Sequence, residues 1–172
     1  MFESGEREEI RQAVRVQWIV WVVMAASVVL YLGLAHLFEA DLHGATSVEP
    51  DLRGYIRIVF QAFTVIVIVI TPYVRRSILR KPNFGSGQEA AIPQLGSAGP
   101  VTQSARRHTA AHIVSIALSE QIALLGLLLF LFGDSFRTLY MFAAVSIISM
   151  IAYVPRAVAI EALAVELKRR MG

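Results

Sequence analysis

Four long apolar stretches decide what this chain can fold into. They cover residues 16–38, 55–74, 109–132 and 139–154, and the first contains no Lys, Arg, Asp or Glu. A helix needs about 20 apolar residues to cross a hydrocarbon core of about 30 Å. The β-branched run at residues 64–71 is typical of a strand in water, but an isolated strand in lipid leaves its backbone unpaired. We therefore predict an all-α integral membrane protein, built as a four-transmembrane-helix bundle.

The composition narrows the possible function classes. The chain is 56% hydrophobic and only 17% charged, which is too apolar for an ordinary soluble domain. It contains no cysteine, which excludes disulfides, thiolate metal sites and cysteine nucleophiles. No nucleophile with a base, no phosphate-binding glycine loop and no other catalytic motif is visible. We expect a protein that is not an enzyme.

The basic residues predict the orientation of the chain. All but Arg53, Arg57 and Arg137 of the 16 Lys and Arg lie in residues 1–15, 75–108 or 155–172. The positive-inside rule places these three segments in the cytoplasm, so both termini are expected inside. Residues 39–54 are then an acidic external loop and residues 133–138 an external turn.

The cytoplasmic segments differ in their expected structure. Residues 1–15 and 155–172 are predicted to form short amphipathic helices, and the centre of the 75–108 loop is a Gly-, Pro- and Ser-rich linker. Their basic residues flank apolar segments, which predicts contact with anionic lipid or an acidic partner and not with nucleic acid. The candidates for this contact are Arg7, Arg11, Arg15, Arg75, Arg76, Arg106 and Arg107.

Glu120 is the acidic residue expected deep inside a span. Counting about 1.5 Å per residue from Thr109 places it roughly 16 Å into the membrane, near the midplane. The same counting brings Ser27, Thr64 and Ser146 to similar depth, so we expect these hydroxyl groups to form a polar layer around the carboxyl group. An ionised carboxylate costs on the order of 3 kcal/mol at this depth. Glu120 is therefore expected either to carry a proton or cation, or to tie helices together as a neutral hydrogen-bonding group.

Three further residues are candidates at the two membrane interfaces. His108 and His112 share one helix face at i and i+4, where they either ligate a metal or haem or form an interfacial pair without a metal. Apart from that alternative, no cofactor is predicted. Arg57 lies just inside the second span, and we expect it to reach the headgroups or to pair with Asp51 or Glu39.

Together these features predict a non-enzymatic accessory subunit of a larger membrane complex. Its helices would pack against other membrane subunits or against further copies of the chain. Two alternatives remain open: a proton- or cation-conducting oligomer that uses Glu120, and a redox anchor that binds haem or quinone near His108 and His112. The short loops and the uncleaved first span indicate the inner membrane of a bacterium.

Overall fold

A computed structural model of the chain describes residues 4–39, 49–80 and 100–171. Helices make up 92% of these residues, and the described part contains no strand. The helices are α1 (Ser4–Leu37), α3 (Pro50–Arg80), α4 (Pro100–Leu131), α5 (Phe136–Ala152) and α6 (Ala157–Met171). The β-branched run lies inside α3, so the prediction of helix there is confirmed.

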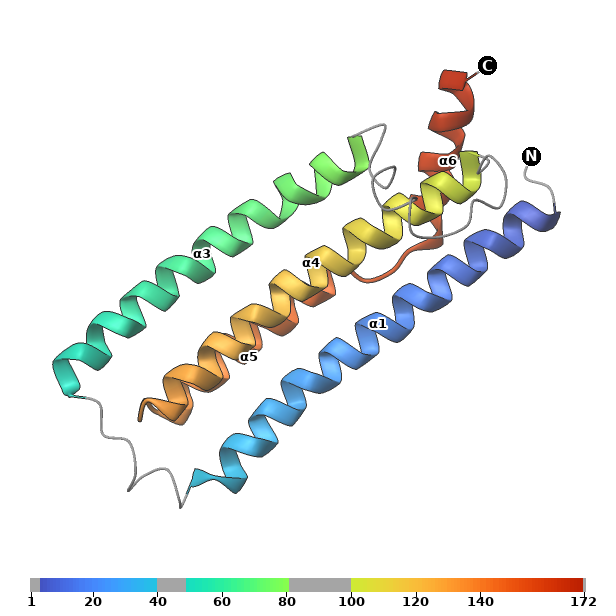
Figure 1. Ribbon diagram of the computed structural model, residues 1–172. Helices are drawn as coiled ribbons and strands as arrows, with labels where there is room; N and C mark the ends of the chain where they lie inside the picture. The colour runs from blue at the N-terminus through green and yellow to red at the C-terminus, as the bar shows by residue number, and fades with distance from the viewer. Residues whose placement is uncertain (1–3, 40–48, 81–99, 172) are drawn as a thin grey trace, which may run out of the picture.

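Helix α4 lies at the centre of the bundle. Figure 1 shows α1 and α3 on either side of it and α5 alongside it, with successive long helices running in opposite directions. The apolar part of α4 is 44% buried, compared with 11% for α1 and 17% for α3. Two of the apolar clusters that contribute to this burial join α4 to α1 and to α3. One joins Val28 of α1 to Ile116 of α4, and the other joins Val67 of α3 to Ile122 of α4.

The bundle has two chemically different ends. At the hairpin end, α1 and α4 finish, α3 begins, and α4 turns directly into α5 (Figure 1). At the terminal end lie the start of α1, the end of α3, the start of α4 and the whole of α6 (Figure 1). There Ile10, Val101 and Ile160 form a small separate cluster that holds α1, α4 and α6 together.

The helices are longer than the sequence predicts. The expected N-terminal helix at residues 1–15 continues without a break into the first span, because α1 runs for 34 residues. Helix is also found at residues 75–80 and 100–108, at both ends of the expected central loop. The expected linker between them and most of the acidic loop lie outside the described residues. At about 1.5 Å per residue α1 is about 51 Å long, so it extends well past a hydrocarbon core of about 30 Å.

A glycine closes the turn between α4 and α5. Gly133 has a φ of 86°, a conformation that side-chain-bearing residues rarely adopt. Its N–H donates to the carbonyl of Phe130, and the N–H of Asp134 donates to that of Leu129, which is the Schellman pattern of a helix end. This turn sets α5 antiparallel to α4 and places Asp134 at the hairpin end.

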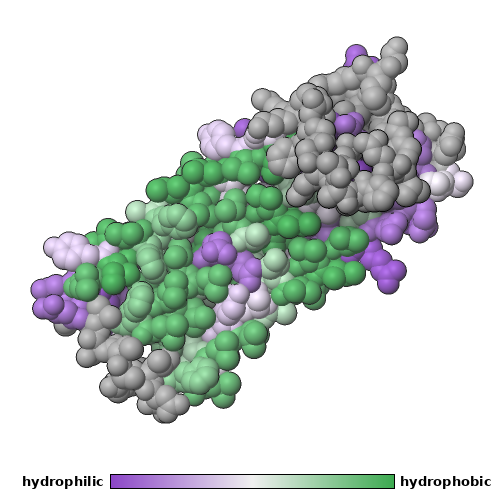
Figure 2. Space-filling model, in the orientation of Figure 1, coloured by the Kyte–Doolittle hydropathy of each residue, from purple (hydrophilic) through white to green (hydrophobic). Residues whose placement is uncertain are grey.

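The surface of the bundle is strongly apolar. Figure 2 shows a broad hydrophobic face along the long helices, with hydrophilic side chains gathered toward the ends and in a small area over the middle of α4. Large exposed side chains include Leu30 at 59%, Ile66 at 51% and Ile148 at 66%. Continuous apolar surface of this extent is unfavourable in water and matches the interior of a bilayer.

Candidate functional site

The carboxyl group of Glu120 on α4 faces α1. Its Oε1 atom lies 2.5 Å from Ser27 Oγ and 2.7 Å from Tyr31 Oη. Ser27 and Tyr31 are one helical turn apart on α1, so both reach the same oxygen. All three side chains are only partly buried. The site therefore links α1 to α4 halfway along the bundle.

The hydroxyl group of Ser27 has two acceptors within reach. Ser27 Oγ also lies 2.7 Å from the carbonyl oxygen of Met24, and one hydroxyl group has only one hydrogen to donate. Tyr31 donates to the same oxygen of Glu120, so this oxygen keeps a hydrogen bond from α1 whichever acceptor Ser27 uses. These contacts lie in the part of the helix where an unpaired charge is most costly.

The expected polar layer forms only in part. Ser27 contacts Glu120, as the depth count predicts. Thr64 instead donates to the carbonyl of Phe60 in its own helix, at 2.9 Å. Ser146 of α5 donates to the carbonyl of Ser119 at 2.7 Å and so ties α5 to α4.

Gln121, next to Glu120 on α4, lies at the surface of the bundle. Its side chain is exposed and makes no hydrogen bond with any described residue. It shares an open face of α4 with Ile113 and Leu128, which are 38% and 41% exposed. An amide without a hydrogen bond to any described residue thus lies on an apolar face of α4.

The two candidate histidines of α4 both face α1. His108 Nδ1 lies 3.3 Å from Gln17 Nε2, and His112 Nε2 lies 3.3 Å from the backbone oxygen of Gln17. Gln17 is fully buried and its amide also donates to Thr109 at 3.1 Å. Among the described residues, no group of three or more His, Cys, Asp or Glu is arranged to hold a metal ion. The structure thus places His108 and His112 in a polar contact between α1 and α4.

The candidate arginines all lie toward the terminal end. Most of them are exposed to the surroundings: Arg7, Arg11, Arg15, Arg76 and Arg106. Two are drawn into the bundle. The guanidinium group of Arg75 stacks over the ring of Tyr153 at 5.2 Å, and Arg107 is only 6% exposed.

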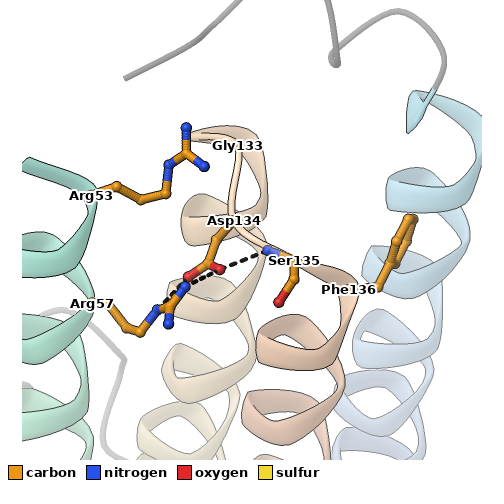
Figure 3. Close-up of a pocket in the computed structure, with 6 residues that line it drawn as sticks. All are labelled: Arg53, Arg57, Gly133, Asp134, Ser135 and Phe136. Carbon is orange, nitrogen blue, oxygen red and sulfur yellow. Dashed lines mark hydrogen bonds and ion pairs between the residues drawn. The ribbon is translucent and has the colours of Figure 1, made fainter. Parts of the chain in front are cut away.

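Arg57 of α3 forms an ion pair with Asp134 at the hairpin end. Arg57 Nε donates to one carboxylate oxygen at 2.7 Å, and its second nitrogen donates to the other oxygen (Figure 3). The backbone N–H of Ser135 and the hydroxyl group of Thr138 also donate to Asp134. Burial opposes ionisation of Asp134, but these hydrogen bonds and the charge of Arg57 hold its pKa below the usual value of 3.8. The partner is therefore neither Asp51 nor Glu39, the two that the sequence had indicated.

The fold and these contacts define a class of protein. Three helices, α1, α3 and α4, are long and apolar enough to cross a membrane, so the described part of the chain fits an all-helical membrane protein. The comparisons add no family: no family model, no curated protein and no solved structure matches the chain.

Three residues of these contacts were not predicted from the sequence. Tyr31 has a detectable signal, because it follows Ser27 by one turn inside an apolar span. Gln17 is likewise a polar residue at the edge of that span. Asp134 was assigned only to a turn, since nothing in the local sequence shows which helix lies beside it.

Proposed function

We propose that this chain is a non-enzymatic subunit of a larger assembly in the inner membrane of a bacterium. It would cross the membrane four times, with the terminal end in the cytoplasm. The fourth crossing would be α5, which at 17 residues is about 26 Å long and packs antiparallel on α4. The concentration of arginine at the terminal end supports this orientation, and anionic lipid or an acidic protein would bind there.

The exposed amide of Gln121 is the observation that carries the proposal. An amide group facing hydrocarbon loses its hydrogen bonds to water and gains none from lipid. Glu120 beside it has its partners within the chain, whereas Gln121 has none among the described residues. A helix of another subunit, or of a second copy, lying along the open face of α4 would provide the missing hydrogen bond.

Site-specific photo-crosslinking in native membranes tests this proposal. A photoreactive amino acid at position 121 should yield a protein adduct. The same group at position 66 should yield lipid adducts, because Ile66 is exposed on α3 with an apolar surface around it. Gln121→Leu should weaken copurification of the adduct partner. Lipid adducts alone at position 121, together with a monomer on a native gel, would refute the proposal.

A second candidate function rests on the carboxyl group of Glu120, which lies in the middle of a span with the hydroxyl groups of Ser27 and Tyr31 beside one of its oxygens. A carboxyl group with hydroxyl neighbours at this depth is the kind of group that a proton- or cation-conducting oligomer requires. Glu120→Gln keeps the shape and removes the exchangeable acid. Proton flux into vesicles should be lost in this variant, and unchanged flux would exclude the idea. The redox-anchor alternative at His108 and His112 has a separate test, since the purified assembly should then contain haem or quinone.

A further inference from the structure

One face of α4 stays open along the middle of the bundle. Its positions follow one another in steps of three or four residues, which keeps them on one side of a helix with 3.6 residues per turn. They are Ile113, Ala117, Gln121, Leu124 and Leu128. All five side chains are exposed or half-buried, although α1, α3 and α5 pack around the rest of α4 (Figure 1). We call this stripe the open face of α4.

The charged residues of α4 nearest to this face do not prevent a neutral partner from packing on it. Glu120 lies at the edge of the face, and its carboxyl group hydrogen-bonds to side chains of α1. Arg106 lies on the same side of α4, but at about 1.5 Å per residue it is about 22 Å along the helix from Gln121. It belongs to the terminal end, ahead of the apolar residues 109–132. The part of the face inside the span is therefore apolar except for one amide.

Gln121 lies at the depth where an unpaired amide is most costly. It follows Thr109 by 12 residues and precedes Phe132 by 11, so at about 1.5 Å per residue it is about 17 Å from either end of the span. Gln61 of α3 is a second exposed amide within a span, but it follows Tyr55 by only six residues and is about 9 Å from the end. Gln121 is thus the exposed amide farther from water, and it gains most from a partner.

A second copy of the chain carries the matching group at the matching depth. An amide both donates and accepts, so two Gln121 side chains can each donate to the oxygen of the other. The arginines orient every copy in the same direction, which brings the two amides to the same height. A twofold axis along the membrane normal then makes the two hydrogen bonds reciprocal.

A single polar residue in an otherwise apolar helix interface also fixes the register and the number of helices. A different protein would need a polar group of its own at this height, whereas a second copy always has one. We propose that two copies of the chain associate through the open face of α4, with Gln121 paired across the twofold axis. This inference rests on the proposed function, because both require that face to be covered by protein.

Disulfide crosslinking tests the geometry, because the chain contains no cysteine of its own. Ala117 lies one turn before Gln121 on the open face, so a cysteine there stands near its counterpart while the amide pair is kept. Ala117→Cys in native membranes, treated with a membrane-permeable oxidant, should form a covalent dimer of the full chain. Ile66→Cys is the matched control, since Ile66 is 51% exposed at similar depth on α3, and it should stay monomeric.

The contribution of the amide is measured by energy transfer between two labelled populations of the full chain in micelles. Gln121→Leu removes two reciprocal hydrogen bonds, so the dissociation constant of the dimer should rise by on the order of tenfold. Gln61→Leu makes the same exchange of amide for apolar side chain on α3 and should leave the constant unchanged. Unfolding of each variant in mixed micelles shows whether it retains the fold.

The outcomes separate this inference from the proposed function. Equal dimer yields from Ala117→Cys and Ile66→Cys, or equal dissociation constants for Gln121→Leu and Gln61→Leu, would overturn the pairing of two copies. An adduct between position 121 and a different protein, without a dimer from Ala117→Cys, would also overturn it and would leave the proposed function standing. A dimer from Ala117→Cys with no other protein crosslinked or copurified would support the pairing and contradict the larger assembly.

Discussion

Helices α4 and α5 approach each other closely at Gly126, and replacing this residue tests the packing. A Cβ atom built on Gly126 would lie 2.6 Å from Phe142 Cβ, 3.3 Å from Phe142 Cγ and 3.5 Å from the backbone oxygen of Leu139. Carbon atoms in contact normally stand about 3.5 to 4.0 Å apart. Because Cβ of Phe142 is attached to the backbone, no change of rotamer relieves the contact. Helix α5 itself must move by about 1 Å.

The expected cost follows from overpacking in a close-packed interface. Forcing such a shift destabilises a folded protein by about 1–3 kcal/mol. Alanine also favours a helix over glycine by about 1 kcal/mol, which partly offsets this cost. Gly33→Ala gives the matched control, because Gly33 lies inside α1 with no atom within 4 Å of the added Cβ. The propensity gain cancels between the two variants, so Gly126→Ala should be less stable than Gly33→Ala by about 1–3 kcal/mol.

Reversible unfolding in mixed micelles measures this difference. The protein in a mild detergent is titrated with sodium dodecyl sulfate, and the fluorescence of Trp18 and Trp21, the only two tryptophans, is followed. The transition of Gly126→Ala should move to a lower fraction of the denaturing detergent, whereas that of Gly33→Ala should not. Equal stability of the two variants would show that α5 does not pack against Gly126 as described.

Two further predictions concern the links between helices. Asp134 has a lowered pKa, so its pairing with Arg57 stabilises the fold fully above the unfolded pKa of about 3.9 and is lost as pH falls through the lower folded pKa. The wild type should therefore exceed Asp134→Asn in thermal midpoint by a constant amount at neutral pH, and a gap that persists unchanged in strong acid would contradict this. Trp21→Phe removes the hydrogen bond from the indole N–H to the Met150 carbonyl and should cost about 0.5–1.5 kcal/mol in the micelle titration. An unchanged unfolding transition for Trp21→Phe would mean that this hydrogen bond contributes nothing to stability.

The helices of this fold were predictable because few backbone structures can cross a bilayer. A backbone in hydrocarbon must pair its own polar groups. Length and apolarity therefore predict a helix even for the β-branched run of α3. The helix ends were less predictable. Helices α1 and α4 continue beyond the apolar spans because apolar contacts at the terminal end, such as Ile10 with Ile160, bury their extensions. Such contacts depend on α6, which the local sequence of α1 cannot show.

The candidate site was predictable in depth but not in direction. Counting residues placed Ser27, Thr64 and Ser146 near Glu120 in height, yet only Ser27 reaches it. Height along a helix follows from sequence position alone, whereas the side facing a neighbour depends on which helices pack together. Because α1 packs directly on α4, Ser27 meets Glu120. Thr64 on α3 bonds within its own helix instead.

The two polar neighbours in the middle of α4 differ in what each one faces. Glu120 is the residue that the sequence singles out, but it hydrogen-bonds to Ser27 and Tyr31 of α1 within one chain. Gln121 carries no charge, so the sequence singles it out less clearly, yet it is the one exposed on an apolar face of α4. If the protein acts through an internal proton site, Glu120→Gln should abolish activity and Gln121→Leu should spare it. If it acts as a subunit, Gln121→Leu should disrupt the assembly while Glu120→Gln leaves it intact, because an amide at position 120 still pairs with Ser27 and Tyr31.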